Sequence, residues 1–200
     1  MFDDTYLTIT APSEGLYKEK GSKFLAFAYP VRTETEVKEH LERIKKEYFD
    51  ARHHCYAYIL GPHKDAFRIN DDGEPSGTAG KPIHGQLLST NLTDVCVIVV
   101  RYFGGIKLGV SGLINAYKTA ARDALDNATI VEKTIDIGYH LHFEYPLMND
   151  VMRILKDFDI PPRNPKYELD CELDFFIRQS LSVQVYDAIA KLRGVTITSL

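Results

Sequence analysis

Asp-Asp-Gly-Glu-Pro-Ser-Gly-Thr-Ala-Gly-Lys-Pro at residues 71–82 and Arg-Tyr-Phe-Gly-Gly-Ile-Lys-Leu-Gly-Val-Ser-Gly at residues 101–112 are the most distinctive stretches of this 200-residue chain. Between them lies an unbroken apolar run, Val-Cys-Val-Ile-Val-Val, at residues 95–100. A run of this length and composition predicts a central strand covered on both faces. The two loops hold seven of the 13 glycines, beside Lys and Arg side chains. Because glycine is costly in regular structure, this clustering indicates close backbone approach to a ligand, often an anion.

The second glycine-rich loop connects the expected strand to an expected helix. We predict a strand over residues 94–103 and a helix over residues 112–128 with Ser111 as its N-cap. Unpaired backbone N–H groups and the helix dipole make such a helix start favourable for a phosphate or carboxylate. The residues of this candidate anion site are Arg101, Gly104, Gly105, Lys107, Gly109, Ser111 and Lys118. The alternative is a tight strand-to-helix connection in which glycine is needed only because the backbone adopts positive φ or packs closely.

The first glycine-rich loop fails the standard nucleotide motifs. Pro75 stands where a P-loop has its first glycine, and Pro82 stands where a P-loop has Ser or Thr. The acidic residues of this loop match no calcium-loop spacing. An Asp-Gly turn at residues 72–73 explains the start of the loop. The small residues that follow indicate a loop that stays open or packs tightly, with Lys81 as a further candidate anion ligand.

Catalysis and metal binding lack a recognisable signature in the sequence. His53 and His54 belong to a strand whose successive residues face opposite sides, so they cannot bind one metal together. No nucleophile motif surrounds Ser111, and Cys96 lies within the apolar run, where thiols are usually inert. If the chain is an enzyme acting on a small phosphorylated or carboxylated substrate, its candidate acid/base residues are Asp72, Glu74 and His84. We therefore expect no metal and no cofactor, and a binding protein rather than an enzyme.

Helical and alternating apolar patterns predict the remaining elements. Up to residue 134 these are a strand at 5–10, a hairpin over 13–31 turning at Gly21-Ser22, a helix over 34–49 with a Thr33/Glu36 capping box, paired strands at 54–60 and 66–70, and a short helix around 78–90. From residue 137 they are a strand at 137–145, a helix opened by Pro146, a strand over 167–178 that can fold into a hairpin, a helix ending at Gly194 and a strand at 195–199. This second series indicates a ferredoxin-like domain. We expect an α+β fold of two domains, residues 1–134 and 138–200.

Composition narrows the function classes. The net charge of −4 argues against a protein that coats nucleic acid indiscriminately, so a polyanion site must be a local cluster. Lys18, Lys20 and Lys23 gather at the predicted hairpin tip beside Tyr17 and Phe24, an arrangement that can support base stacking with phosphate contact, but the interspersed Glu14 and Glu19 favour a solvated hairpin. No apolar run reaches the roughly 20 residues of a membrane span. The acidic start of the chain is unlike a signal peptide, and three scattered cysteines suit a reducing cytoplasm.

Four stretches of the sequence resemble a known family. They are Gly-Ser-Lys-Phe at 21–24, His-His-Cys-Tyr-Ala-Tyr at 53–58, the loop at 71–82, and Val-Arg-Tyr-Phe-Gly-Gly-Ile-Lys-Leu-Gly at 100–109. In this order and at these distances they are similar to the IMPACT family, bacterial YigZ branch. The resemblance covers about residues 15–130, and the remainder looks like the C-terminal domain of that branch. Gly-Val-Ser-Gly at 109–112 departs slightly from the family's usual Gly-Gly before the helix.

The resemblance implies an N-terminal IMPACT domain that resembles the second domain of a small-subunit ribosomal protein. It also implies a C-terminal ferredoxin-like domain similar to one in elongation factor G. Eukaryotic relatives regulate translation by restraining the activation of an initiation-factor kinase through a shared partner. They carry an extra N-terminal interaction domain that we do not expect in this chain, so that particular mechanism is not expected here.

We therefore expect a cytoplasmic regulator of translation that binds RNA or a ribosome-associated protein. The candidate nucleic-acid-binding residues are Lys23, Arg52, His54, Lys81, Arg101, Gly104, Gly105, Lys107, Gly109, Ser111 and Lys118. Two alternatives stay open, the enzyme described above and a protein-interaction adaptor. RNA binding that weakens with salt, thermal shifts with metabolites and a pull-down partner distinguish the three possibilities.

Overall fold

The computed structural model of the chain describes residues 4–200. The interpretation of the acidic start rests in part on residues 1–3, which lie outside that range. The chain divides into two compact units. We call Tyr6–Lys133 the N-terminal unit, and Thr134–Leu200 together with Asp4 and Thr5 the C-terminal unit. Within residues 4–200 no helix is long and apolar enough to cross a membrane.

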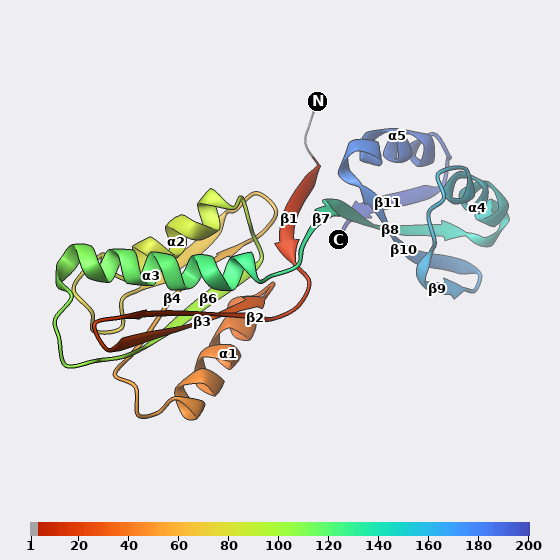
Figure 1. Cartoon of the computed structure of the whole chain (residues 1–200). Helices are drawn as coiled ribbons and strands as arrows, with labels where there is room; N and C mark the ends of the chain where they lie inside the picture. Colours follow the sequence, from red (N-terminus) through yellow and green to blue (C-terminus); the bar gives the residue numbers. More distant parts are fainter. Residues whose placement is uncertain (1–3) are drawn as a thin grey trace. The chain divides into compact units, whose positions relative to one another are not determined.

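The N-terminal unit is built on a five-stranded sheet in which every pair of neighbours is antiparallel. In sheet order the strands are β2 (Ser13–Glu19), β3 (Ser22–Pro30), β6 (Val95–Tyr102), β4 (His53–Leu60) and β5 (Ala66–Asn70). Figure 1 shows α1 (Glu34–Glu47) on one face of this sheet and α2 (Gly80–Ser89) with α3 (Gly109–Asp126) on the other. A separate two-stranded sheet joins β1 (Thr5–Ile9) to β7 (Ile130–Thr134).

Strand β6 is the centre of the sheet, as the apolar run predicts. Every residue from Val95 to Arg101 is buried. The odd-numbered Val97 and Val99 pack in the core beneath α2 and α3, whereas the even-numbered Ile98 and Val100 pack beneath α1. Alternate residues of a strand point to opposite faces, so a strand covered by helices on both faces must be apolar throughout. The sheet therefore has two hydrophobic cores, one on each face.

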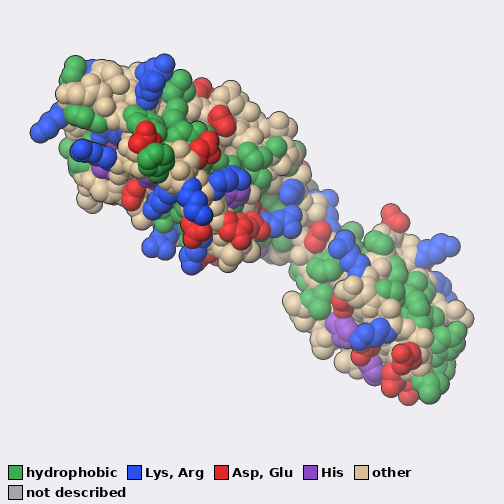
Figure 2. Space-filling model, turned by 90° about the horizontal axis from the view of Figure 1, so that it is seen from below, with side chains coloured by type: hydrophobic (Ala, Val, Ile, Leu, Met, Phe, Trp, Pro, Cys, Tyr) green, Lys and Arg blue, Asp and Glu red, His purple; other side chains and the backbone are tan. Residues whose placement is uncertain are grey.

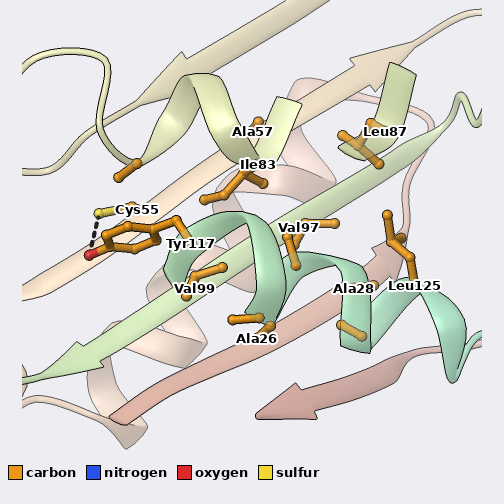
Figure 3. Packing of buried hydrophobic residues seen from close by; sticks show 14 of the residues in the cluster. Ala26, Ala28, Cys55, Ala57, Ile83, Leu87, Val97, Val99, Tyr117 and Leu125 are labelled. Atoms are coloured by element: carbon orange, nitrogen blue, oxygen red, sulfur yellow. Dashed lines mark hydrogen bonds between the residues drawn. The ribbon is translucent and has the colours of Figure 1, made fainter. Parts of the chain in front are cut away.

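Helix α3 packs closely against the sheet because its buried side is rich in alanine. Five of its apolar residues are buried against the sheet, namely Leu113, Tyr117, Ala120, Ala121 and Ala124. On the facing strand β2, a Cβ atom added to Gly15 would lie 2.3 Å from the backbone nitrogen of Ala124. Figure 3 shows Tyr117 and Leu125 of α3 in the same cluster as Ile83 and Leu87 of α2. Small residues on both elements thus set the distance between helix and sheet.

The sequence predicts N-cap residues for α1 and α3, and the structure confirms one of them. The predicted Thr33 cap is confirmed, since its hydroxyl accepts a hydrogen bond from the Glu36 backbone N–H (3.2 Å). The predicted Ser111 cap is wrong, because α3 already begins at Gly109 and Ser111 lies in its first turn. Gly109 has φ +73, a conformation that glycine adopts without steric cost, so the chain enters the helix earlier than the serine indicates.

The C-terminal unit has the order strand, helix, two strands, helix, strand. Its elements are β8 (Asp136–Glu144), η1 (Tyr145–Leu147), α4 (Met148–Asp157), β9 (Arg163–Tyr167), β10 (Asp170–Arg178), α5 (Gln179–Ala190) and β11 (Val195–Ser199). The sheet order is β11-β8-β10-β9, with all neighbours antiparallel. This is the ferredoxin-like arrangement of the predicted series. The strand predicted at 167–178 corresponds to β10, and its hairpin partner β9 lies before it, inside the proline-rich segment, as an edge strand that tolerates Pro165.

Candidate anion-binding surface

Both glycine-rich loops lie at one end of the N-terminal unit, which we call the loop end. Strands β6, β5 and β2 finish there at Tyr102, Asn70 and Glu19, whereas β3 and β4 begin there at Ser22 and His53. This follows from the antiparallel pairing of neighbouring strands. The loop at 71–79 leads directly into α2, and the loop at 103–108 leads into α3. The fold therefore brings the two sequence motifs together.

The glycines of the second loop have two different roles. Gly104 packs against the β2–β3 turn, where an added Cβ would lie 2.0 Å from the carbonyl carbon of Gly21. Its backbone N–H also donates to the Ser22 hydroxyl (3.0 Å). Gly105 and Gly109 have φ of +89 and +73, and a Cβ at either position would meet no atom within 4 Å. Gly104 is thus required for close packing, while the other two allow the chain to turn.

The first loop is held by the carboxylate of Asp71. Its two oxygens accept hydrogen bonds from the backbone N–H groups of Gly77 (2.9 Å), Ala79 (3.1 Å) and Gly80 (2.8 Å). These groups lie at the start of α2, where the helix dipole favours a negative charge. The chain's own carboxylate therefore occupies this helix start, and the first loop is not an open anion site.

The expected turn at Asp72 and Gly73 is confirmed. Both residues have positive φ, +40 and +85, and the Glu74 N–H donates to the Asp71 carbonyl (2.9 Å). Positive φ at both central residues is the feature of a type I′ turn. The Asp72 carboxylate then accepts the backbone N–H of His54 (2.7 Å), which ties the turn to β4.

Behind the two loops lies a buried polar cluster that the sequence did not predict. Glu74 Oε1 accepts hydrogen bonds from Arg101 Nη1 (2.6 Å) and from the Tyr117 hydroxyl (2.7 Å). Cys55 Sγ lies 3.3 Å from the same hydroxyl, a contact drawn in Figure 3. Burial raises the pKa of the Cys55 thiol and of the Tyr117 hydroxyl, and their mutual contact and the nearby Glu74 raise the Tyr117 pKa further. Both groups are neutral at physiological pH, so Cys55 is a structural thiol rather than a nucleophile.

This arrangement corrects the prediction that Arg101 and His54 bind an anion at the surface. Arg101 is only 7% exposed and forms an ion pair with Glu74, so it does not present a free charge at the surface. His54 is buried as well, and its Nε2 lies 2.9 Å from the Tyr48 carbonyl oxygen. Both side chains point into the structure because they belong to strands whose two faces are covered by helices. They hold the loops in place and are not free surface cations.

The other predicted anion-binding residues lie on the surface or close to it. Lys23 is exposed at the start of β3, opposite Tyr102 of β6, and Lys107 is exposed in the second loop. Arg52 is exposed immediately before β4. Lys81, Ser111 and Lys118 are exposed on α2 and α3, with Lys118 nine residues into α3 and thus about 13 Å from its start. Lys23, Arg52 and Lys107 therefore share the loop end, whereas Lys118 lies further along the helix.

Exposed apolar side chains accompany these cations. Phe103, at the first position after β6, is 56% exposed. The Arg101 guanidinium carbon lies 5.6 Å from the centroid of the Phe103 ring and 5.6 Å from that of Phe24. Figure 2 shows Lys and Arg side chains beside hydrophobic ones at the left end of the N-terminal unit. Phe103 is not among the residues predicted to bind a ligand, although an aromatic residue directly between a buried strand and a Gly-Gly pair is a signal for an exposed ring.

The three candidate acid/base residues have separate partners. Glu74 belongs to the buried cluster, and Asp72 holds the His54 backbone. His84 stacks on Phe67 with ring centroids 4.9 Å apart, and burial lowers its pKa. No contact among residues 4–200 joins these three side chains into one catalytic group. Within the same range no three His, Cys, Asp or Glu side chains are placed to hold a metal ion.

Comparison with known proteins identifies the class to which this fold and surface belong. The family model described as the Impact N-terminal domain matches residues 20–125, which include both glycine-rich loops. The chain belongs to the IMPACT family, as its motifs predict.

Two bacterial family members show how far the relationship extends. The IMPACT family member YvyE of Bacillus subtilis is 33% identical over 88% of this chain and 81% of its own length. The IMPACT family member YigZ of Escherichia coli is 34% identical over 82% of both chains. A crystal structure of a hypothetical protein, 29% identical, superimposes with a TM-score of 0.76 over 98% of both chains. The relationship therefore covers both units.

Proposed function

We propose that the loop end of the N-terminal unit binds single-stranded RNA and that the chain acts in translation through this contact. The observation that carries the proposal is the exposed ring of Phe103 at the end of a fully buried strand, with the exposed cations Lys23, Arg52 and Lys107 at the same end of the sheet. Single-stranded nucleic acid binds by stacking its bases on aromatic rings and by placing its phosphates beside Lys and Arg.

The rigidity of this surface supports RNA binding. Phe103 rests against Arg101, which is itself fixed by Glu74, and Gly104 locks the following loop onto the β2–β3 turn. A ring held in place loses little conformational entropy when a base stacks on it. Stacking of this kind contributes about 1–3 kcal/mol per base. The surface thus combines an aromatic platform with cations within a few residues of it.

Family membership supports the translation-linked part of the proposal. Eukaryotic relatives are expected to regulate translation. As part of the same proposal, the N-terminal unit is related to a domain of a small-subunit ribosomal protein. The C-terminal unit is related to a domain of elongation factor G. Fold kinship alone is a weak guide to function, so the surface carries the argument. A role in translation requires the cytoplasm, where the three buried cysteines stay reduced.

Salt-dependent RNA binding tests the proposal. We expect a fluorescent single-stranded oligoribonucleotide to bind at low salt, with log K falling against log salt with a slope of about −0.7 for each phosphate neutralised. The Lys23→Glu/Lys107→Glu variant should abolish most binding, and Phe103→Ala should weaken it by about 1–3 kcal/mol. The matched control is Lys38→Glu/Lys45→Glu, which changes the same charge on exposed positions of α1.

Three results would contradict this function. The proposal fails if no RNA binds at low salt, or if the control variant weakens binding as much as the loop-end variant. Sedimentation with ribosomes that is insensitive to the loop-end substitutions, without binding to free RNA, would instead indicate a protein partner. A metabolite-induced thermal shift that RNA does not compete with would favour an enzyme.

A further inference from the structure

A cleft of about 460 Å³ opens at the loop end, where β4 starts beside the end of β6. It is lined by Asp50, Ala51, Arg52, His53, Arg101, Tyr102 and Phe103. The volume lies within the roughly 300–1,000 Å³ that small-ligand sites occupy. The wall of the cleft carries the exposed Arg52 charge, the His53 imidazole and the Arg101 guanidinium, whose charge is balanced by Glu74; Asp50 is the one carboxylate in the lining. The Arg52 charge and the N–H donors of the cleft therefore favour an anion.

Arg101 gives this cleft a fixed group of hydrogen-bond donors. Its Nη1 is held by Glu74 at 2.6 Å, and its guanidinium carbon lies 5.6 Å from the ring centroids of both Phe24 and Phe103. Its buried Nε has no hydrogen-bond acceptor among residues 4–200. A guanidinium has five N–H donors in a planar fork that matches the oxygens of a phosphate. The side chain is thus held by Glu74, and its Nε is a donor that no group in residues 4–200 accepts.

His53 and Arg52 add to this group from the opposite strand. His53 Nδ1 lies 2.8 Å from the Asp72 carbonyl oxygen, and because a carbonyl only accepts, Nδ1 carries the proton. This assignment leaves Nε2 for a proton or a ligand. Arg52 is exposed beside it. The Asp50 carboxylate accepts the Tyr102 hydroxyl (2.7 Å), and its other oxygen suits a hydroxyl donor such as that of a ribose.

We infer that the cleft binds a nucleoside monophosphate group, with the phosphate at Arg52, His53 and Arg101 and the base against Phe103. A terminal phosphate monoester carries close to two negative charges at neutral pH, whereas an internal phosphodiester carries one, so the Arg52 charge together with the N–H donors of Arg101 favours the monoester. The inference rests on the proposed RNA binding and makes it more specific. The group has two sources, the phosphorylated end of an RNA chain and a free nucleotide.

Binding of end-modified oligoribonucleotides to the full chain tests the inference. The probes are one ten-nucleotide sequence with a 5′-phosphate, a 3′-phosphate or only hydroxyl ends, and adenosine monophosphate as competitor. We expect one phosphorylated end to bind about tenfold more tightly than the hydroxyl form, as charge-assisted hydrogen bonds of about 1.5–3 kcal/mol allow. Arg52→Ala should remove this difference. Arg68→Ala, which removes an exposed arginine from β5, should keep it.

The outcomes separate the cleft from the wider surface. Equal binding of all three oligoribonucleotides, unchanged in their ratio by Arg52→Ala, overturns the inference while RNA binding stands. Arg52-dependent binding of adenosine monophosphate without any RNA binding supports the cleft and refutes the proposed RNA-binding function. Competition between the nucleotide and the phosphorylated RNA assigns the terminal nucleotide as the source. A nucleotide that neither binds nor competes, with no gain from either phosphorylated end, also overturns the inference.

Discussion

At the scale of single residues, the buried ion pair between Glu74 and Arg101 determines how the loop end is held. Replacing Glu74 by glutamine keeps an acceptor for Tyr117 but leaves the Arg101 charge without a counter-ion in a buried site. Removing one partner of a buried pair costs about 3–5 kcal/mol. We expect Glu74→Gln to lower the free energy of unfolding by roughly this amount in urea denaturation followed by circular dichroism.

A second variant separates the charge from the loss of packing. In Glu74→Gln/Arg101→Met both charges are gone, and a buried pair replaced by apolar groups is often close to neutral. The double variant should therefore be more stable than Glu74→Gln alone. A double variant as unstable as the sum of its single substitutions would show that the ion pair is not what holds these loops.

The same residues show where the sequence is a sufficient guide and where it is not. Six consecutive apolar residues have no favourable exposed arrangement, so the burial of Val95–Val100 is predictable. Arg101 is the next residue, borders a glycine-rich loop and is predicted to be a surface cation. Its burial depends on Glu74, which is 27 residues away in the sequence. A single sequence does not encode that pairing in any local pattern, because the pairing arises from strand register and from the fold of the first loop.

At the scale of elements, the glycines of the second loop make a contrasting prediction. Alanine at Gly104 would place its Cβ 2.0 Å from the Gly21 carbonyl carbon, and neither backbone can move without disturbing the β3–β6 pairing. We expect Gly104→Ala to cost more than about 3 kcal/mol, the upper end of ordinary overpacking. In Gly105→Ala the added Cβ meets no atom within 4 Å, so the variant should lose only the about 1–2 kcal/mol that a non-glycine residue costs in the left-handed region. Urea denaturation of both variants measures the difference, and equal losses would contradict the packing role of Gly104.

Whole elements are more predictable than their ends. The apolar spacing of α3 correctly identifies its buried face, because that spacing reflects burial along the full length of the helix. The start of α3 depends on one backbone angle, φ +73 at Gly109, which overrides the capping preference of Ser111. The predicted hairpin at 167–178 also leaves out most of the edge strand β9, since its proline suits an edge but contradicts the usual strand pattern. Apolar periodicity therefore identifies an element and its buried face, whereas local backbone geometry and position in the sheet determine where the element begins and ends.

At the scale of the whole molecule, each unit has a hydrophobic core of its own. In the C-terminal unit Asp4 accepts two hydrogen bonds from Arg178, through Nε and Nη2 (2.7 Å each), and one from the Ser180 N–H (3.1 Å). Hydrogen bonds from Arg178 and Ser180 hold the pKa of the Asp4 carboxyl well below its usual range. Asp4, near the start of the chain, is thus fixed to the C-terminal unit by these hydrogen bonds.

This lowered pKa predicts how stability of the C-terminal unit depends on pH. Because the folded-state pKa lies below the unfolded value of about 3.9, the Asp4 contribution is complete above about pH 5 and is lost as the pH falls through the folded-state pKa. Asp4→Asn should lower the urea midpoint of NMR signals from this unit at pH 7, and the gap from the unsubstituted chain should narrow steadily below pH 4. Asp150→Asn, which breaks an exposed pair with Arg153, should change little at any pH. A gap that is absent at pH 7, or that is undiminished at pH 2, would exclude this carboxylate as the acid-sensitive contact of the unit.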